Sequence, residues 1–550
     1  MEVVSHINNP IIPGFHPDPD IIRVGSDYFI TTTSFEWFPG IPIHHSTDLA
    51  NWRLIGHALG PKQMDLGPVP DSGGIYIPSI AWHKGTFYMV YSVVYEGAWP
   101  HVANRCHIIT ANDITGPWSE PVYLNSMAFD PAVFIDRDGR IYIINLVMET
   151  RLERGPQMKG FMLQEYDPKE KRLAGDARMI FETTDHGLHP EGPHLYHIGE
   201  YYYLMCAIGG TKWDHGTMFM RSRSPWGPYE RAPNTPMLTS KGDPGNPLQK
   251  AGQGCIVDTP GGDWFLAHHA GRPVGSQRVC PLGRETCLQQ IRWNAEDWPE
   301  LAHGGIHPAT TIILPSAKPA KTSTPAGRAS IEESFSSPQL DPEWCTLREP
   351  PSADWLRIDP EARCLSLRGR QPIAARYQQS LVARRWTSVH FTAQTRLDFN
   401  PAHYRQMAGL ICYYDTSDFA YACVTHDEEA GRCLQLVQRI SGRRWHECPR
   451  LAQPMPVPDG PVGLRVRIAE LSMQFSYRSA ESGEWISLGE ELDGAHLSDE
   501  GPDGSLMRFT GAFVGMAAHD PLYESVWAHF YRFSVLPFGP SSAGSKPNTG

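Results

Sequence analysis

The sequence predicts an all-β protein, with a five-bladed β-propeller followed by a β-sandwich domain of the jelly-roll, lectin-like kind. Three observations predict it: an aromatic strand motif that recurs five times, a Pro-, Lys-, Ser- and Thr-rich segment after it, and alternating apolar and polar runs in the second half. The chain has 550 residues, which is more than a domain with a single hydrophobic core usually contains, so two or more domains are expected. The 50 Gly, 49 Pro and many aromatic residues favour short strands over long helices.

The five motif copies follow one another at a nearly constant interval. Each is a turn residue followed by an aromatic-rich β run, and alignment superposes one ring from each copy, 59, 54, 61 and 62 residues apart: Phe29, Tyr88, Tyr142, Tyr203 and Phe265. About 60 residues suffice for a four-stranded antiparallel sheet, and radial repetition of such sheets protects their edges. The alternative is a β-sandwich with accidental similarity, but the constant period favours the propeller.

These patterns divide the chain into four parts. Residues 1–313 are expected to form the propeller, and residues 314–330 (LPSAKPAKTSTPAGRAS) a linker, because they lack an apolar period. Residues 331–537 carry strand candidates such as MAGLICYYDT and WAHFYRFSVL, which are typical of a sandwich. Residues 538–550 are expected to form a disordered tail.

Charge and composition narrow the partners. The formal net charge of −12 argues against nucleic acid and against an anionic membrane surface, and it is compatible with a neutral sugar. The oligomeric state stays open, a homo-oligomer included. The eleven Cys are odd in number and form no CxxC pair, so no disulfide framework is expected. The N-terminal string MEVVSHINNPIIPGF has no basic and long apolar signal, which predicts a cytoplasmic protein, or a secreted one if the chain has been trimmed.

One position in each repeat, at the mouth of the first strand of the blade, carries the candidate chemistry: Asp18, Tyr76, Asp130, Glu191 and Gln253. In a propeller this strand lines the axis, so three of the five positions direct carboxylates at one pocket. Because like charges repel and burial disfavours ionisation, at least one carboxyl pKa should rise, as a general acid requires. Any single Asp beside a Pro or Gly fits a turn or cap, whereas three at equivalent positions favour acid–base catalysis such as glycoside hydrolysis.

Four strings carry a resemblance to a known family. NPIIPGFHPDPDIIRVGSDYFITTTSFEWFPGIPIHHSTDLANW, FDPAVF, PEGPHLY and LGRETCLQQIRW are similar to the N-terminus, the second Asp, the Glu and the arginine-bearing strand of the β-xylosidases of glycoside hydrolase family 43. The resemblance covers nearly the whole chain, including FTGAFVGMAA. It implies an exo-acting, inverting hydrolase that releases xylose from the non-reducing ends of xylo-oligosaccharides. Arabinosyl-substituted xylan fragments and α-L-arabinofuranosidase activity are implied beside this.

The resemblance also implies roles for the polar residues. Asp18 would be the general base on water, Glu191 the general acid, and Asp130 the group that orients Glu191 and raises its pKa. Arg284 would bind sugar hydroxyls and temper the field of the acids, with a surface ion pair as the alternative. An inverting pair of carboxyl groups stands roughly 6.5–9.5 Å apart, which leaves room for water.

By the same resemblance, rings would surround the terminal sugar. Phe35, Tyr76 and Phe129 would form the wall of its subsite, with ordinary propeller core as the alternative. His268 would lie near the pocket. Phe509 of the second domain would close the pocket mouth and enforce exo action, with sandwich core as the alternative.

Two positions depart from the family pattern. Tyr76 stands where the family usually has Trp, which makes the wall smaller and adds a hydroxyl. Gln253 stands where the family commonly has a His that in some relatives helps to hold Ca²⁺ near the axis. We expect that the protein requires no cofactor. Binding of Ca²⁺ at the propeller axis stays an open alternative, because the Gln253 amide also offers an oxygen ligand.

Three other functions compete with this one. The first is an enzyme that is mainly an α-L-arabinofuranosidase. The second is a non-catalytic carbohydrate-binding propeller, and the third is a structural interaction propeller. The presence of all three axial acids argues against the last two.

Overall fold

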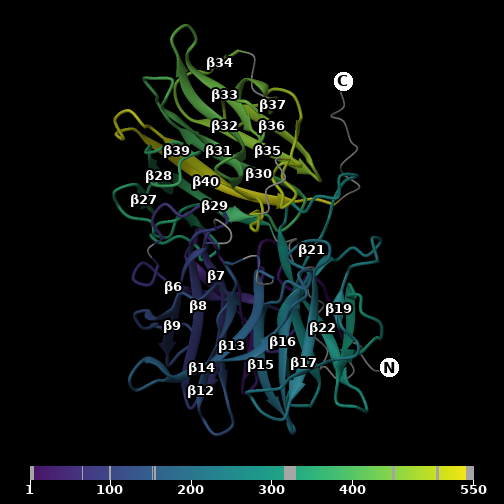
Figure 1. Cartoon of the computed structure of the whole chain (residues 1–550). Helices are drawn as coiled ribbons and strands as arrows, with labels where there is room; N and C mark the ends of the chain where they lie inside the picture. The colour runs from purple at the N-terminus through teal and green to yellow at the C-terminus, as the bar shows by residue number, and fades with distance from the viewer. Residues whose placement is uncertain are drawn as a thin grey trace. The chain divides into compact units, whose positions relative to one another are not determined.

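The computed structural model describes residues 5–64, 66–97, 101–151, 153, 156–314, 330–448, 453–502 and 507–539. Within these ranges the chain is built from β-strands and contains no α-helix (Figure 1). None of the described residues forms a helix long and apolar enough to cross a membrane. Most of the predicted linker and tail, residues 315–329 and 540–550, lies outside the described residues.

Five antiparallel sheets form the blades of the propeller, which confirms the predicted fold class. The first blade has β2 (Asp20–Val24), β3 (Asp27–Thr31), β5 (Gly40–Ser46) and β6 (Arg53–Leu59), and the second has β7 (Gly74–His83), β8 (Thr86–Glu96), β9 (Ala103–Ala111) and β10 (Val122–Asn125). The third has β11 (Ala132–Ile135), β12 (Ile141–Met148), β13 (Met158–Asp167) and β14 (Arg172–Glu182). The fourth has β15 (Glu191–Ile198), β16 (Tyr201–Ile208), β17 (Gly216–Ser222), β18 (Glu230–Arg231) and β19 (Leu238–Thr239). The fifth has β20 (Gln249–Asp258), β21 (Trp264–Gly271), β22 (Arg284–Trp293) and β23 (Pro299–Leu301).

The first strand of each blade lies innermost. Each contacts the first strand of the next blade, in the order β2, β7, β11, β15, β20 and back to β2, so the five strands close a ring around one axis. The second strands, which carry the aligned rings, are buried between neighbouring blades. Strand β12 is apolar except for Asn145, and its first six residues are buried because both of its faces are covered. Strand β1 (Ser5–Asn8) pairs with β24 (Thr311–Leu314) and links the two ends of the propeller sequence.

The second unit is a sandwich of two antiparallel sheets, as predicted. One sheet has the order β27 (Leu356–Asp359), β28 (Cys364–Arg368), β40 (Trp527–Pro537), β30 (His390–Asp398), β35 (Val462–Ala469), β36 (Ser472–Arg478) and β37 (Ile486–Ser487), with β25 (Ile331–Glu333) beside β40 and β38 (Leu492–Asp493) beside β36. The other has the order β29 (Ser380–Arg385), β39 (Phe513–His519), β31 (Met407–Asp415), β32 (Asp418–Asp427), β33 (Gly431–Arg439) and β34 (Met455–Pro456). Their inner faces share one core, to which Leu410, Val466 and Phe530 belong.

Two short segments from the propeller half of the sequence belong to the sandwich unit, residues 13–15 and 273–283. A hydrogen bond and ring packing hold them there. The Ala512 N–H donates to the Pro281 carbonyl at 2.7 Å, and the Phe15 and Phe513 rings lie 6.0 Å apart, edge to face. The strand pattern does not indicate this exchange, because neither segment carries an apolar period of its own.

Candidate active site

The innermost strand of every blade either contains a residue in the left-handed conformation or begins two residues after one. The φ angles are 54°, 28°, 58°, 53° and 43°, for Asp18, Ile77, Asp130, Gly192 and Gln253. For residues other than glycine this conformation is strained, and strain of this kind gathers at functional sites, where the surrounding structure holds it. The backbone equivalence therefore differs from the sequence alignment by one residue in two blades, because Tyr76 and Glu191 each precede the left-handed residue.

Asp18 carries a negative charge that two neighbours stabilise. Arg284 Nη1 donates to Asp18 Oδ1 at 3.0 Å, and the backbone N–H of Asp18 donates to His269 Nδ1 at 3.1 Å. Burial alone would raise the pKa of Asp18, but the Arg284 charge and the His269 ring outweigh it and hold that pKa well below its usual range. Arg284 is 3% exposed, so the alternative of a surface ion pair is wrong.

Glu191 and Asp130 show the opposite behaviour. Burial, followed by the negative charge of Asp18, raises the pKa of Glu191 to about 7. Burial, followed by the charges of Glu191 and Asp18, raises the pKa of Asp130 well above its usual range. Near neutral pH the site therefore contains an ionised Asp18 beside a pair, Asp130 and Glu191, that retains a proton.

The oxygens of this pair are only partly satisfied. Asp130 Oδ2 accepts the Gly192 N–H at 3.1 Å, which ties the third blade to the residue after the candidate acid. Asp130 Oδ1 and Glu191 Oε1 are buried and make no hydrogen bond to any residue that the structure describes. A buried polar atom without a partner is costly, so Glu191 Oε1 is poised to meet a polar atom of a bound molecule.

Three rings continue the site from the first to the third blade. The Phe35 and Tyr76 rings lie 4.8 Å apart, edge to face, and the Tyr76 and Phe129 rings lie 6.0 Å apart. The Arg284 guanidinium lies 6.0 Å from the centre of the Phe35 ring, so the rings adjoin the charged groups. The Tyr76 hydroxyl donates to the Ser72 carbonyl at 2.6 Å, which engages its proton within the protein. This arrangement combines an apolar wall with acidic groups, as sugar-binding sites require.

His269 is a site residue that the sequence reasoning missed. Its neighbour His268 is fully buried, with Nδ1 3.0 Å from the His269 carbonyl and Nε2 3.3 Å from Gln289 Nε2. Adjacent residues of a strand point to opposite faces, so only one of the two rings can face Asp18. The sequence contains no signal that selects between them. Phe509 is half-buried before β39 in the sandwich unit, and its position at the pocket mouth stays a prediction.

The surroundings of Gln253 test the calcium expectation. Its side chain packs against Gly192, and its Oε1 is buried without a hydrogen-bond partner in the described part of the chain. Ca²⁺ takes about six to eight oxygen ligands, and this single amide oxygen adjoins no set of described acidic groups that could share an ion. The residues present do not fit a protein-built Ca²⁺ site, so the catalytic steps are assigned to side chains alone.

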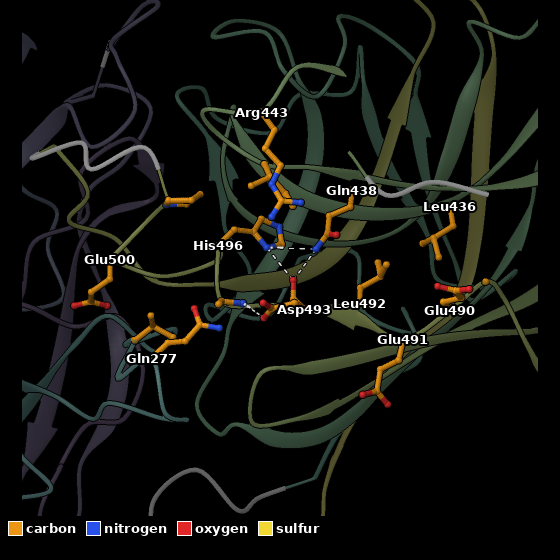
Figure 2. Close-up of a pocket in the computed structure, with 15 residues that line it drawn as sticks. Gln277, Leu436, Gln438, Arg443, Glu490, Glu491, Leu492, Asp493, His496 and Glu500 are labelled. Carbon is orange, nitrogen blue, oxygen red and sulfur yellow. Dashed lines mark hydrogen bonds between the residues drawn. The ribbon is translucent and has the colours of Figure 1, made fainter. Parts of the chain in front are cut away.

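A separate cavity of about 570 Å³ lies within the sandwich unit (Figure 2). Among its lining residues, Gln438 Nε2 donates to the Asp493 carbonyl at 2.7 Å, and His496 Nδ1 lies 3.2 Å from the same oxygen. The described residues of its lining include Glu490, Glu491 and several aliphatic side chains, but no Phe, Tyr or Trp. It therefore lacks the flat apolar face on which a sugar ring stacks, and the axial site of the propeller is the stronger candidate.

Two family models match the chain, one for each unit. Glycosyl hydrolases family 43 matches residues 7–299, and the β-xylosidase C-terminal concanavalin A-like domain matches residues 332–536.

Similar proteins span almost the full length of the chain. A β-xylosidase of Bacillus subtilis (strain 168) is 40% identical over 96% of this chain and 99% of its own. Xylosidase/arabinosidase 43B of Humicola insolens is 41% identical over 97% of this chain and 98% of its own. The crystal structure of a xylan β-1,4-xylosidase from Bacillus halodurans C-125 has a TM-score of 0.91 at 40% identity, and covers 96% of this chain and 100% of that one.

Proposed function

The chain belongs to glycosyl hydrolase family 43, and we propose that it is an exo-acting, inverting β-xylosidase with α-L-arabinofuranosidase side activity. Its substrates would be xylo-oligosaccharides and arabinosyl-substituted xylan fragments, from whose non-reducing ends it releases one pentose at a time. The full-length relatives described as β-xylosidase and xylosidase/arabinosidase support this substrate class. The net charge of −12 also suits a neutral substrate.

The observation that carries the proposal is the contrast in protonation between two buried carboxyl groups of one site. Asp18 is ionised because Arg284 and His269 hold its pKa low, whereas burial raises the pKa of Glu191 to about 7. An inverting hydrolase needs this combination, since one group must accept a proton while the other supplies one.

In the proposed reaction a water molecule attacks the anomeric carbon while Asp18 takes its proton. The bond from that carbon to the glycosidic oxygen breaks, and Glu191 donates its proton to the departing oxygen. Asp130 would position the acid through its hydrogen bond to Gly192 N–H, and Arg284 would keep Asp18 ionised while it binds a sugar hydroxyl. Phe35 and Tyr76 would pack against the pentose ring.

The experiment compares the wild-type enzyme, Asp18→Ala and Glu191→Ala on xylobiose and on an aryl β-xyloside with a good leaving group. Both variants should lose xylobiose activity by roughly 10²–10⁴-fold, and Glu191→Ala should retain more activity on the aryl substrate, which needs less protonation. Glu200→Ala, which removes an exposed carboxyl, is the matched control and should behave as wild type. Equal activity of all four proteins would exclude these roles.

Stereochemistry supplies an independent test. NMR of the first product should show α-xylose released from the β-linkage, because a single displacement inverts the anomeric carbon. Initial release of β-xylose would contradict the inverting mechanism while leaving the hydrolase assignment intact.

A second candidate is an enzyme that is mainly an α-L-arabinofuranosidase. Tyr76 favours it, because the wall at this position is smaller than the Trp of the usual family pattern. The ratio of kcat/KM on aryl β-xyloside and aryl α-L-arabinofuranoside decides between them, and Tyr76→Trp should move this ratio toward xylose.

A further inference from the structure

A second ring of side chains lies along the propeller axis, two residues beyond the left-handed residue of each blade. Successive side chains of a strand alternate between faces, so residues two apart share one face. The members of this ring are all at most 6% exposed: Asp20, Ser79, Ala132, His194 and Cys255. Two of them are small, while the other three carry a carboxylate, an imidazole and a thiol.

The three functional groups converge from three different blades. One ligand atom each from Asp20, His194 and Cys255 lies within 4.8 Å of the other two, and Asp20 Oδ2 is 3.4 Å from His194 Nε2. Bonds of about 2.0–2.3 Å in a tetrahedral site place neighbouring ligand atoms roughly 3.5 Å apart. The carboxylate and imidazole already stand at this separation, and the Cys255 sulfur lies within 4.8 Å of both.

His194 supplies the second observation. The residue is 6% exposed, yet neither of its ring nitrogens makes a hydrogen bond with any described residue, because the 3.4 Å contact of Nε2 with Asp20 Oδ2 lacks hydrogen-bond geometry. Buried polar atoms are normally hydrogen-bonded, so an imidazole that lacks a hydrogen bond at both nitrogens is incomplete without a further partner. The other two ligands are oriented: Asp20 Oδ2 accepts the Ile80 N–H at 2.7 Å, and Cys255 Sγ accepts the Ile21 N–H at 2.8 Å.

We propose that Asp20, His194 and Cys255 bind one divalent transition-metal ion of the Zn²⁺ or Co²⁺ type on the propeller axis, with water as a fourth ligand. Imidazole nitrogen and thiolate sulfur select such ions over Ca²⁺ and Mg²⁺, which prefer oxygen alone. On binding, the Cys255 thiol releases its proton to solvent and the thiolate forms the metal–sulfur bond. This site is distinct from Gln253 and from the carboxyl groups assigned to hydrolysis, and it does not depend on the proposed activity.

Because the site is buried, the test loads the metal during folding. The full-length protein is produced in medium supplemented with Zn²⁺ or with Co²⁺, washed with chelator, and analysed for metal content. Wild type should retain about one ion per chain, and the Co²⁺ form should show thiolate-to-cobalt charge-transfer absorption. Cys255→Ser and His194→Gln should lose both signals, whereas Cys412→Ser, which removes a buried thiol of the sandwich unit, should keep them.

Circular dichroism and thermal unfolding check that each variant is folded. If Cys255→Ser is unfolded, His194→Gln alone carries the comparison, since glutamine conserves polarity and approximate size. Metal-free wild type from both media would overturn the proposal. Equal metal content in wild type and in the folded variants would also overturn it, because the ion would then be bound elsewhere.

Discussion

Burial of the Glu191 carboxyl group has two expected consequences: it makes the stability of the folded protein depend on pH, and it keeps a proton available for catalysis. Replacing Glu191 by glutamine should remove both. The side chain is 7% exposed, and burial followed by the charge of Asp18 raises its pKa from 4.5 to about 7. In the unfolded chain the carboxyl ionises near 4.5. As the pH rises from 4.5 to 7 the unfolded state therefore binds fewer protons than the folded state, and the free energy of unfolding falls. Glutamine keeps the shape and carries no charge, so it removes this dependence.

The magnitude follows from the two pKa values. The ionisation difference costs the folded state about 1 kcal/mol at pH 5 and about 3 kcal/mol at pH 8. For a propeller of roughly 300 residues, 3 kcal/mol corresponds to about 5 °C in Tm. Glu191→Gln should therefore unfold at a higher temperature than wild type at pH 8, with a much smaller difference at pH 5. The same variant should lose nearly all activity on xylobiose.

Thermal unfolding from pH 5 to pH 8 is the assay, with two glutamine controls. Glu200→Gln changes a side chain that is 76% exposed and should leave Tm unchanged at both pH values. Glu285→Gln should lower Tm throughout, because the buried Glu285 carboxylate accepts hydrogen bonds from Arg272 at 2.6 and 2.9 Å. A Glu191→Gln variant that is less stable than wild type at pH 8 would refute the raised pKa and, with it, the assignment of Glu191 as the acid.

The remaining predictions concern the same site. For the wild type, kcat/KM on xylobiose should fall as the pH rises through about 7, where Glu191 loses its proton, and a pH profile that stays flat up to pH 9 would contradict this. Asp18→Asn should lower the free energy of unfolding by about 3–5 kcal/mol, since it removes the buried negative charge that lies 3.0 Å from the Arg284 guanidinium, and urea denaturation measures this loss. Phe35→Ala should raise KM for xylobiose by roughly tenfold through lost ring packing, with a smaller change in kcat; an unaltered KM would show that the ring does not touch the sugar.

Local sequence patterns were sufficient for the architecture. The aromatic period placed the second strand of all five blades, since Phe29, Tyr88, Tyr142, Tyr203 and Phe265 lie on β3, β8, β12, β16 and β21. The candidate acids were found in the same way, because a repeated strand places equivalent residues at equivalent positions. The sequence did not show that Glu191 lies one residue before the left-handed residue of its blade. This displacement arises from a one-residue irregularity in the pairing of β15 with β16.

The sequence alone determined the fold class and the family, and it predicted three acidic site residues whose carboxyl groups interact in the structure, because each inference depends on residues close together in the chain. Only the tertiary structure decided their protonation, since the Arg284 charge that ionises Asp18 comes from a residue 266 positions away. It also selected His269 over His268, and it gathered Asp20, His194 and Cys255 from three blades. Such contacts arise when the ring of blades closes, and a distant charge or ligand leaves no trace in the local pattern of either partner.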